Sequence, residues 1–577
     1  MRAPATSSAT ADVAGVLRRE PERLGSEQFD LAVVGGGIHG AWVALDAARR
    51  GLKTALVEQG DFGHATSANS QRIVHGGLRY LQQLDLARFR QSVRERATLL
   101  RLAPHLVRPL PVLVPTGGRG MNGRAALGAA IKLNDWLSAG RNRGLSETRR
   151  IPDGRLVSAE VCFEALPAVR GSWCTGGALF HDAQVHDSER LCLAVVRSAR
   201  VAGAEVANHV QLTRWLADGS TVAGFEAEDR LAGRSIRVFA RLVVTCVGPW
   251  TGAMPALAGA PDAGRVALPP SFRAVVLATR PLVSGAAVVL AGGRSDHAAA
   301  KVIPERSRNY FVTPWRDRAL VGTFHAGFDG DPGHLGVSAQ ELEGFLDELR
   351  AASPPIDLRR RDVSQVFVGL LPRGSGRALA AAKRHRIVDH EREEGIRGRL
   401  SVIGVKWTTA RHVAQETVTL ALGKLGRVDP GCTTAAHAIH GGDVGDFEAY
   451  LAAETARLPA GVPPTVLQRL IARHGTAFRE VLGIAADDRA LLEPIAPGRC
   501  EIAAEVVHGV RVESARTLGD VVFRRTGLGT PGWPGRAAIE RCAAVAGREL
   551  GWSAEETAHQ IAEVEASYDR VAAGRVG

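Results

Sequence analysis

The sequence predicts an α/β protein with a Rossmann-like nucleotide-binding domain, an inserted antiparallel β-rich cap domain and a C-terminal α-helical domain. Three observations predict this fold class. A strand, a glycine-rich turn, a helix and a second strand follow one another over residues 29–58. Strand-like apolar runs recur within 256–397, and from residue 445 onward Ala, Glu, Arg and Leu recur at helical spacing.

Length and composition are those of a globular protein with several domains. The chain has 577 residues, of which 45% are hydrophobic and 23% charged, and this excludes fibrous and low-complexity architectures. Its 72 basic and 60 acidic residues leave a formal charge of +12. The excess favours an anionic partner, such as a phosphorylated small molecule, an anionic membrane surface or nucleic acid; the alternative is a solvated basic surface.

Cysteines and the N-terminal segment bear on where the protein works. The seven cysteines are scattered, odd in number and never spaced as CxxC. This pattern is typical of reduced, buried thiols in a cytosolic protein, and it predicts neither a metal site nor a disulfide framework.

Residues 1–27 contain no continuous apolar core, so we expect a flexible extension there. No stretch reaches the roughly 18 apolar residues of a membrane span, which leaves attachment to a membrane surface open.

The nucleotide-binding unit begins with an apolar strand at 30–34, followed by a turn that carries Gly35, Gly37 and Gly40 in a G-x-G-x-x-G pattern. The first glycine permits the turn, the second lets the backbone approach a pyrophosphate, and the third lets the helix pack closely on the strand. Glu58 ends the second strand, 21 residues after Gly37, where its carboxylate can accept hydrogen bonds from a ribose. These residues predict a dinucleotide without separating NAD from FAD.

The next segment, DFGHATSANSQRIVHGGLRYL at 61–81, is too rich in Ser, Thr, Asn, His and Gly for an ordinary crossover helix. Its hydroxyl and backbone N–H groups can serve a second phosphate and a flavin ring; the alternative is a plain surface loop. Within it, ATSxxSxxxxHGGLRYL resembles the FAD-dependent glycerol-3-phosphate dehydrogenases of the aerobic type, in the D-amino-acid-oxidase-like flavoprotein superfamily. Further segments resemble this family, in its order: APHLVRPLPVLVP (103–115), DAQVHD (182–187), VTCVGPW (244–250), FVTPWRD (311–317), VGTFHAGFDGDP (321–332), GVKWTTAR (404–411) and AEVVHGVRVESARTLGDVVFRRT (504–526).

The resemblance implies a noncovalently bound FAD and a reaction. Gly35, Gly37 and Gly40 would hold the pyrophosphate, and Glu58 the adenosine ribose. The flavin side would be lined by Thr66, Ser67, His75, Gly76, Gly77, Leu78, Gly248, Lys406, Trp407 and Thr408. The implied reaction oxidises sn-glycerol 3-phosphate to dihydroxyacetone phosphate, with hydride transfer to flavin N5 and electrons passed to quinone or another acceptor.

Such a reaction needs a cationic clamp for the phosphate and a group that receives the hydroxyl proton. The resemblance implies a clamp of Arg79, Tyr80, Arg384 and Lys406, in which Arg79 and Lys406 also take part in catalysis.

Two stretches depart from the family pattern. A K-G-[ST]-H stretch of the family corresponds here to 271–274, which contains Arg273 and no histidine, so His75 and His325 are the alternatives for proton transfer. A G-[VI]-R-P turn corresponds to 369–372, which puts Leu371 where a phosphate-binding arginine is expected. We therefore predict Arg273 and Arg373 as substitute substrate contacts. The alternative function is a related FAD-dependent oxidase or dehydrogenase acting on a different polyol phosphate, hydroxy acid or amine.

The expected FAD-binding domain is discontinuous, at 28–255 and 398–430, with a substrate cap at 256–397 and a helical domain at 445–570. The basic stretch 117–144 carries Leu127, Ile131, Trp136 and Leu137, which indicates either a helix in an anionic membrane interface or an ordinary helix packed on the cap. Attachment to the cytoplasmic face of a membrane would suit a quinone acceptor; otherwise we expect a cytoplasmic protein. A homodimer stays open, and no nucleic-acid-binding motif is present.

Overall fold

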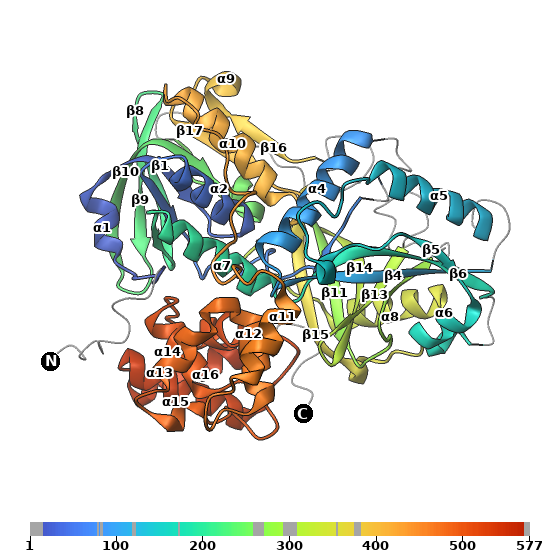
Figure 1. Ribbon diagram of the computed structural model, residues 1–577. Coiled ribbons are helices and arrows are strands. Elements are labelled where there is room, and N and C mark those ends of the chain that lie inside the picture. Colours follow the sequence, from blue (N-terminus) through green and yellow to red (C-terminus); the bar gives the residue numbers. More distant parts are fainter. Residues whose placement is uncertain are drawn as a thin grey trace.

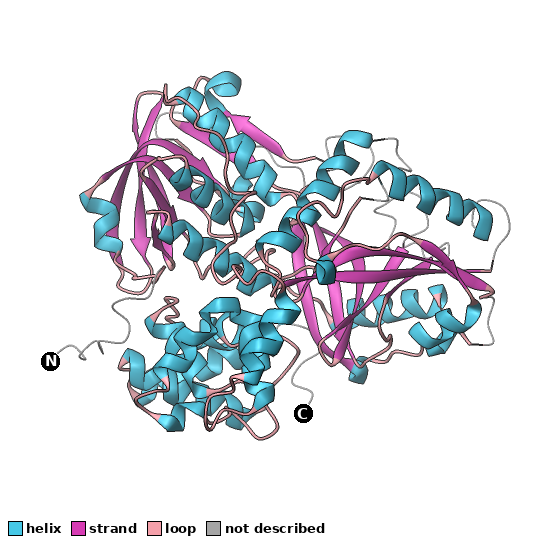
Figure 2. Cartoon of the chain, in the orientation of Figure 1, coloured by secondary structure: helices cyan, strands magenta, loops and turns pink. Residues whose placement is uncertain are grey.

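Two β-sheets lie side by side, and a helical unit packs against both (Figure 1). The structure, a computed structural model, describes residues 15–77, 80, 85–117, 123–170, 174–257, 271–291, 309–353, 356–373, 382 and 384–569. The predicted fold class is confirmed. The strands lie in the two upper units of Figure 2, where they are accompanied by helices, whereas the C-terminal unit consists of helices and loops.

The first sheet has the parallel core expected of a nucleotide-binding domain. Across the sheet its main strands are β16 (Arg386–Asp389), β17 (Arg399–Ile403), β10 (Arg234–Thr245), β1 (Gln28–Val34), β2 (Thr54–Val57) and β7 (Glu205–Ala207). From β17 through β10, β1 and β2 to β7, each strand runs parallel to the next, whereas β16 runs antiparallel to β17. Strands β8 (Val210–Asp218) and β9 (Thr221–Asp229) extend β10 as an antiparallel meander. The carboxyl ends of the parallel strands therefore meet at one edge.

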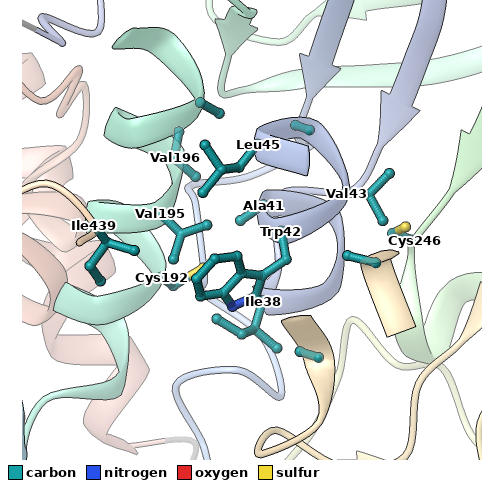
Figure 3. Close-up of a cluster of buried hydrophobic side chains, with 14 of the residues drawn as sticks. Ile38, Ala41, Trp42, Val43, Leu45, Cys192, Val195, Val196, Cys246 and Ile439 are labelled. Atoms are coloured by element: carbon teal, nitrogen blue, oxygen red, sulfur yellow. The ribbon is translucent and has the colours of Figure 1, made fainter. Parts of the chain in front are cut away.

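Small and branched residues pack the helices of this unit. Helix α2 (Ile38–Arg49) contacts both α7 (Ser188–Val201) and α10 (Ala410–Lys424). Trp42 of α2 points toward Cys192 and Val195 of α7, and Val43 points away from them toward Cys246 (Figure 3). This core holds α2 rigidly behind the end of β1.

The second sheet is antiparallel except for one pair. Its strands, in order, are β15 (Val363–Leu371), β11 (Ser271–Thr279), β14 (Arg318–Phe328), β13 (Asn309–Trp315), β12 (Ala287–Ala291), β4 (Val107–Thr116), β6 (Gly176–Val185) and β3 (Ile73–Val74). Strand β12 runs parallel to β4, and β5 (Arg155–Val157) pairs with β6. Helices α8 (Ala339–Ala352) and α6 (Ala159–Ala165) cover one face.

Sheet membership does not follow the expected segments. Strands β3, β4, β5 and β6 lie within 28–255 but belong to the second sheet, and β16 lies within 256–397 but belongs to the first. Strand pattern predicts that a segment is extended but not which distant strand it pairs with, so the sequence could not assign these strands. Residues 15–27 are not a flexible extension: α1 (Pro21–Ser26) packs on β10, and Leu17 and Leu24 are buried. The expected extension at 1–14 lies outside the described residues.

The C-terminal unit contains α11 (Phe447–Ala456), α12 (Pro464–His474), α13 (Phe478–Ile484), α14 (Ala503–Arg511), α15 (Arg536–Leu550) and α16 (Ala554–Asp569). Buried ion pairs join it to the first sheet's domain. Asp61 accepts hydrogen bonds of 2.6 and 2.8 Å from Arg525, and Arg197 of α7 donates to Glu480 of α13 over 2.9 Å. In the part of the chain that the structure describes, no helix is both long and apolar enough to cross a bilayer.

Candidate functional site

A cavity of about 1450 Å³ lies between the two sheets. Its floor is formed where parallel strands of the first sheet end, at Val34, Glu58, Cys246 and Ile403. Strands β11, β14 and β15 of the second sheet supply the opposite wall. Sites for drug-sized ligands measure roughly 300–1,000 Å³, so this cavity has room for an extended dinucleotide and a small second molecule.

The glycine-rich turn lines this floor as the sequence predicts. Gly35 has φ +105°, and a β-carbon there would lie 2.6 Å from the carbonyl oxygen of Cys246. A β-carbon on Gly37 would lie 3.1 Å from Ser67 Oγ, which accepts a hydrogen bond of 2.9 Å from the Ile38 N–H. Gly40 does not line the cavity; it lets α2 approach the turn. The backbone thus lies open toward the cavity at the positive end of α2, where a phosphate is favoured.

Glu58 stands at the end of β2 with its carboxylate held in place. It accepts hydrogen bonds of 2.6 Å from the Gly36 N–H and 2.8 Å from the Gly60 N–H, and it lines the cavity. Each carboxylate oxygen can accept further hydrogen bonds. Glu58 can therefore receive hydroxyls of a ribose at the end of β2.

The structure brings together most of the residues predicted for the flavin side. Those that line the cavity are Thr66, Ser67, His75, Gly77, Gly248, Lys406, Trp407 and Thr408. Thr66 joins the two sheets because its hydroxyl accepts a hydrogen bond of 3.2 Å from the Leu370 N–H. Leu78 and Arg79 lie outside the described residues.

Gly76 shapes the site without lining the cavity. Its N–H donates a hydrogen bond of 2.6 Å to Asp182 Oδ1, and a β-carbon there would lie 2.1 Å from the Arg96 guanidinium. Next to it, Nδ1 of His75 lies 3.3 Å from Asp182 Oδ2. A larger residue after His75 would therefore have to displace the buried Asp182–Arg96 pair.

Lys406 and Tyr80 meet at one end of the cavity. The Lys406 ammonium lies 3.8 Å from the centre of the Tyr80 ring, and the Arg88 guanidinium lies 4.9 Å from that centre. A second cavity of about 670 Å³ shares Lys406 and Ser92 with the first and is lined by Arg88, Arg90, Arg94, Arg384, His385 and His412. Hydrogen bonds from His385 and His412 lower the pKa of Glu416 in its wall to about 2. This end of the site favours anions.

Three predicted substrate contacts lie elsewhere. Arg273 points away from the large cavity, donates to the Gly336 carbonyl over 2.9 Å and pairs with Glu341 of α8. Its place on β11 explains this, because alternate residues of a strand face opposite sides of the sheet. Arg384 lines the second cavity and pairs with Asp85 at 3.1 Å, and Arg373 lines neither cavity. Leu371 and His325 do line the large cavity.

Sequence reasoning missed several residues of the site. Asp182 lies in a segment whose resemblance is evident, but no spacing links it to His75, 107 positions away. Gln71, Trp250 and Phe311 also line the cavity. Gln71 Nε2 donates to the Leu320 carbonyl over 3.1 Å and so ties the loop to the second sheet. Only the pairing of distant strands brings these side chains together.

The cavity fits FAD by its own features. Gly35 and Gly37 have no side chain, so the space that a β-carbon would fill is open. Helix α2 begins directly after Gly37. The buried carboxylate of Glu58 lies at the end of β2. These are the features that a dinucleotide pyrophosphate and ribose require.

Comparisons with known proteins agree with this assignment. A family model described as FAD dependent oxidoreductase matches residues 30–414, and one described as the C-terminal domain of alpha-glycerophosphate oxidase matches 432–557. The glycerol-3-phosphate dehydrogenase of Synechocystis is 31% identical over 562 residues, which cover 94% of this chain and 97% of that protein. This chain belongs to the FAD-dependent glycerol-3-phosphate dehydrogenase family. The resemblance stated from the motifs is confirmed.

Two further relatives of the family extend the comparison. The glycerol-3-phosphate dehydrogenase 2 of Mycobacterium tuberculosis is 32% identical over 555 residues, 94% of this chain and 89% of that protein. A solved structure of the glycerol-3-phosphate dehydrogenase from Bacillus halodurans, complexed with FAD, has a TM-score of 0.71 at 23% identity and covers 94% of this chain and 95% of that chain. The protein is an FAD-dependent oxidoreductase, and FAD is its cofactor.

Proposed function

We propose that this protein oxidises sn-glycerol 3-phosphate to dihydroxyacetone phosphate and passes the electrons to quinone or another acceptor. The observation that carries the proposal is the position of Lys406, whose ammonium stands beside Tyr80 at the end of the FAD-binding cavity. There a cation can hold the phosphate of a small substrate while the rest of the substrate extends into the cavity.

The reaction removes a hydride from the carbinol carbon and a proton from its hydroxyl. Bound FAD supplies the two-electron acceptor chemistry at N5. The protein must hold the alcohol still, exclude water and receive the proton. His75 and His325 both line the cavity and are the two candidates for receiving it.

The substrate's phosphate would be held differently here from the pattern that the family motif implies. Leu371 lines the cavity where an arginine is expected, and Arg373 lies outside the lining. Lys406, with the basic residues of the second cavity behind it, would therefore provide the positive charge. The same observation favours the second candidate function, oxidation of another polyol phosphate, a hydroxy acid or an amine.

Anaerobic reduction of the flavin tests both functions. Purified holoenzyme is mixed with excess glycerol 3-phosphate, and flavin absorbance near 450 nm is followed together with dihydroxyacetone phosphate. Rapid bleaching with stoichiometric product supports the leading function. If glycerol 3-phosphate leaves the flavin oxidised while a hydroxy acid, an amine or another polyol phosphate bleaches it, the second candidate replaces the first.

We further propose that the protein attaches to the cytoplasmic face of a membrane through α5 (Arg124–Leu137), where a quinone acceptor would be reached. Leu133 and Trp136 of this helix are 49% and 73% exposed, and Lys132 is exposed beside them. Ile131 is buried and holds the helix on the protein. Arg141, which belongs to the basic stretch 117–144, is buried and lies 3.5 Å from Asp135.

Binding to liposomes tests this attachment. Vesicles with anionic lipid should bind the wild-type protein at low salt, and the double variant Leu133→Ser, Trp136→Ser should bind them at least about tenfold more weakly. A matched control is Val428→Ser, which removes a 90% exposed apolar side chain elsewhere. Equal binding of all three proteins would contradict the proposal. A homodimer remains a prediction.

A further inference from the structure

We infer that Asp182 is a positioning residue that holds His75 as the proton acceptor of the reaction. Three observations lead to it: the contact between Asp182 and His75, the buried partners that fix Asp182, and the exposure of His75 to the cavity. The inference deepens the proposed function and rests on it, because it chooses between two candidate histidines.

One ring nitrogen of His75 contacts Asp182, and the side chain lines the cavity. Nδ1 lies 3.3 Å from Asp182 Oδ2, the side chain is 47% exposed, and the ring contacts Phe311 edge-on with 5.4 Å between the ring centres. A carboxylate is an acceptor only, so in the neutral ring the proton resides on Nδ1. Nε2 then carries a lone pair that can receive a proton from a bound hydroxyl.

Asp182 is itself fixed by buried donors. Its Oδ1 accepts hydrogen bonds of 2.6 Å from the Gly76 N–H and 2.7 Å from Arg96, and Arg96 also donates to the His181 carbonyl over 2.9 Å. Burial raises the pKa of Asp182, but the hydrogen bond with His75 and the charge of Arg96 outweigh burial and bring that pKa below its usual value. The carboxylate therefore stays ionised at neutral pH.

A buried cluster of this kind is expected to add little net stability to the fold. Burying a carboxylate and a guanidinium costs desolvation energy that their attraction often only balances. A β-carbon at position 76 would also force the Arg96 guanidinium to move. The arrangement resembles the way a carboxylate orients a catalytic imidazole in other enzymes, where it sets the tautomer without taking the proton.

The O–H bond of the substrate breaks and its proton goes to His75 Nε2, while the O–H electron pair forms the C=O bond. The carbinol hydrogen leaves with the C–H electron pair as a hydride, for which FAD, when bound, would be the acceptor. Asp182 remains an anion throughout and stabilises the imidazolium that results.

A double-mutant cycle tests the inference on FAD-loaded protein. His75→Asn and Asp182→Asn should each lower kcat by about 10²- to 10⁴-fold, with KM changed less than about threefold. In the His75→Asn background, adding Asp182→Asn should lower kcat by less than about twofold, since Asp182 acts through His75. If the two losses multiply instead, Asp182 does not act through His75 and the inference is wrong.

Controls separate positioning from folding, and the wild-type kcat with glycerol 3-phosphate, measured first, shows independently whether the proposed function holds. Asp229→Asn removes a comparable buried carboxylate, which pairs with Arg19 and the Leu231 N–H outside the cavity lining, and should leave kcat unchanged. FAD content and Tm are measured for every variant. If Asp182→Asn does not fold, Asp182→Glu, which keeps the charge but misplaces it, takes its place in the cycle. Near wild-type kcat in His75→Asn would overturn the role of His75 itself, and with it the inference.

Discussion

Gly40 lies against the carbonyl group of Gly35, so closely that a β-carbon on Gly40 would stand 1.8 Å from the Gly35 oxygen. Non-bonded carbon and oxygen atoms need more than 3 Å, so α2 can lie this close to the turn only if residue 40 has no side chain. The two glycines therefore act together: one makes the turn and the other lets the helix begin directly behind it.

Gly40→Ala should accordingly displace α2 and loosen FAD. We expect a loss of about 1–3 kcal/mol in the free energy of unfolding and release of most FAD during purification, measured by urea unfolding and by the ratio of 450 to 280 nm absorbance. Gly423→Ala, in α10, meets nothing within 4 Å and serves as the control. A fully yellow Gly40→Ala protein would show that α2 does not need this contact.

Replacing Lys406 should affect phosphorylated substrates selectively. A hydrogen bond to a charged group is worth about 1.5–3 kcal/mol, so Lys406→Met should raise KM for glycerol 3-phosphate roughly 10- to 100-fold and change KM for glycerol little. Steady-state kinetics with both compounds measures this, with Lys53→Met, at an exposed lysine outside the cavity lining, as the control. Equal losses for both compounds would mean that Lys406 does not bind the phosphate.

Removing Asp61 should weaken the junction between the first domain and the C-terminal helices. Asp61 is buried and forms ion pairs with Arg524 and Arg525, and its removal would deprive both guanidinium groups of this partner. Leaving a buried partner unpaired costs about 3–5 kcal/mol, so Asp61→Ala should unfold at clearly lower urea concentration. Glu540→Gln removes an exposed pair with Arg536 and should change stability by less than about 0.5 kcal/mol. Similar effects for both variants would contradict this reasoning.

Glu480 should make stability depend on acid pH. Burial opposes its charge, but His508 and Arg197 prevail and lower the pKa of Glu480 to about 2 from 4.5. A carboxyl with a lowered pKa in the folded state stabilises that state above pH 4.5, and this contribution is lost as pH falls toward 2. The whole contribution is about 3 kcal/mol, and about 2 kcal/mol of it should be lost between pH 6 and pH 3, measured as the change in the free energy of unfolding over that range. In Glu480→Gln this part of the pH dependence should disappear; an unchanged slope would contradict the assignment.

The fold class and the cofactor could be predicted because their determinants are local. Gly35, Gly37, Gly40 and Glu58 act through backbone geometry and strand ends within one continuous βαβ unit, and such units fold to one arrangement. The motif at 404–411 belongs to another part of the chain, yet it too was found by resemblance, and Lys406, Trp407 and Thr408 do line the cavity.

The amino-acid sequence by itself determined the strand-turn-helix unit, the polar loop that follows it and the family. Tertiary structure alone decided which strands pair, and therefore which side chains share the cavity. It placed β4 and β6 in the second sheet, turned Arg273 toward α8, and brought Asp182 beside His75. The physical reason is that strand pairing and burial depend on partners more than a hundred residues away, and no local pattern records them.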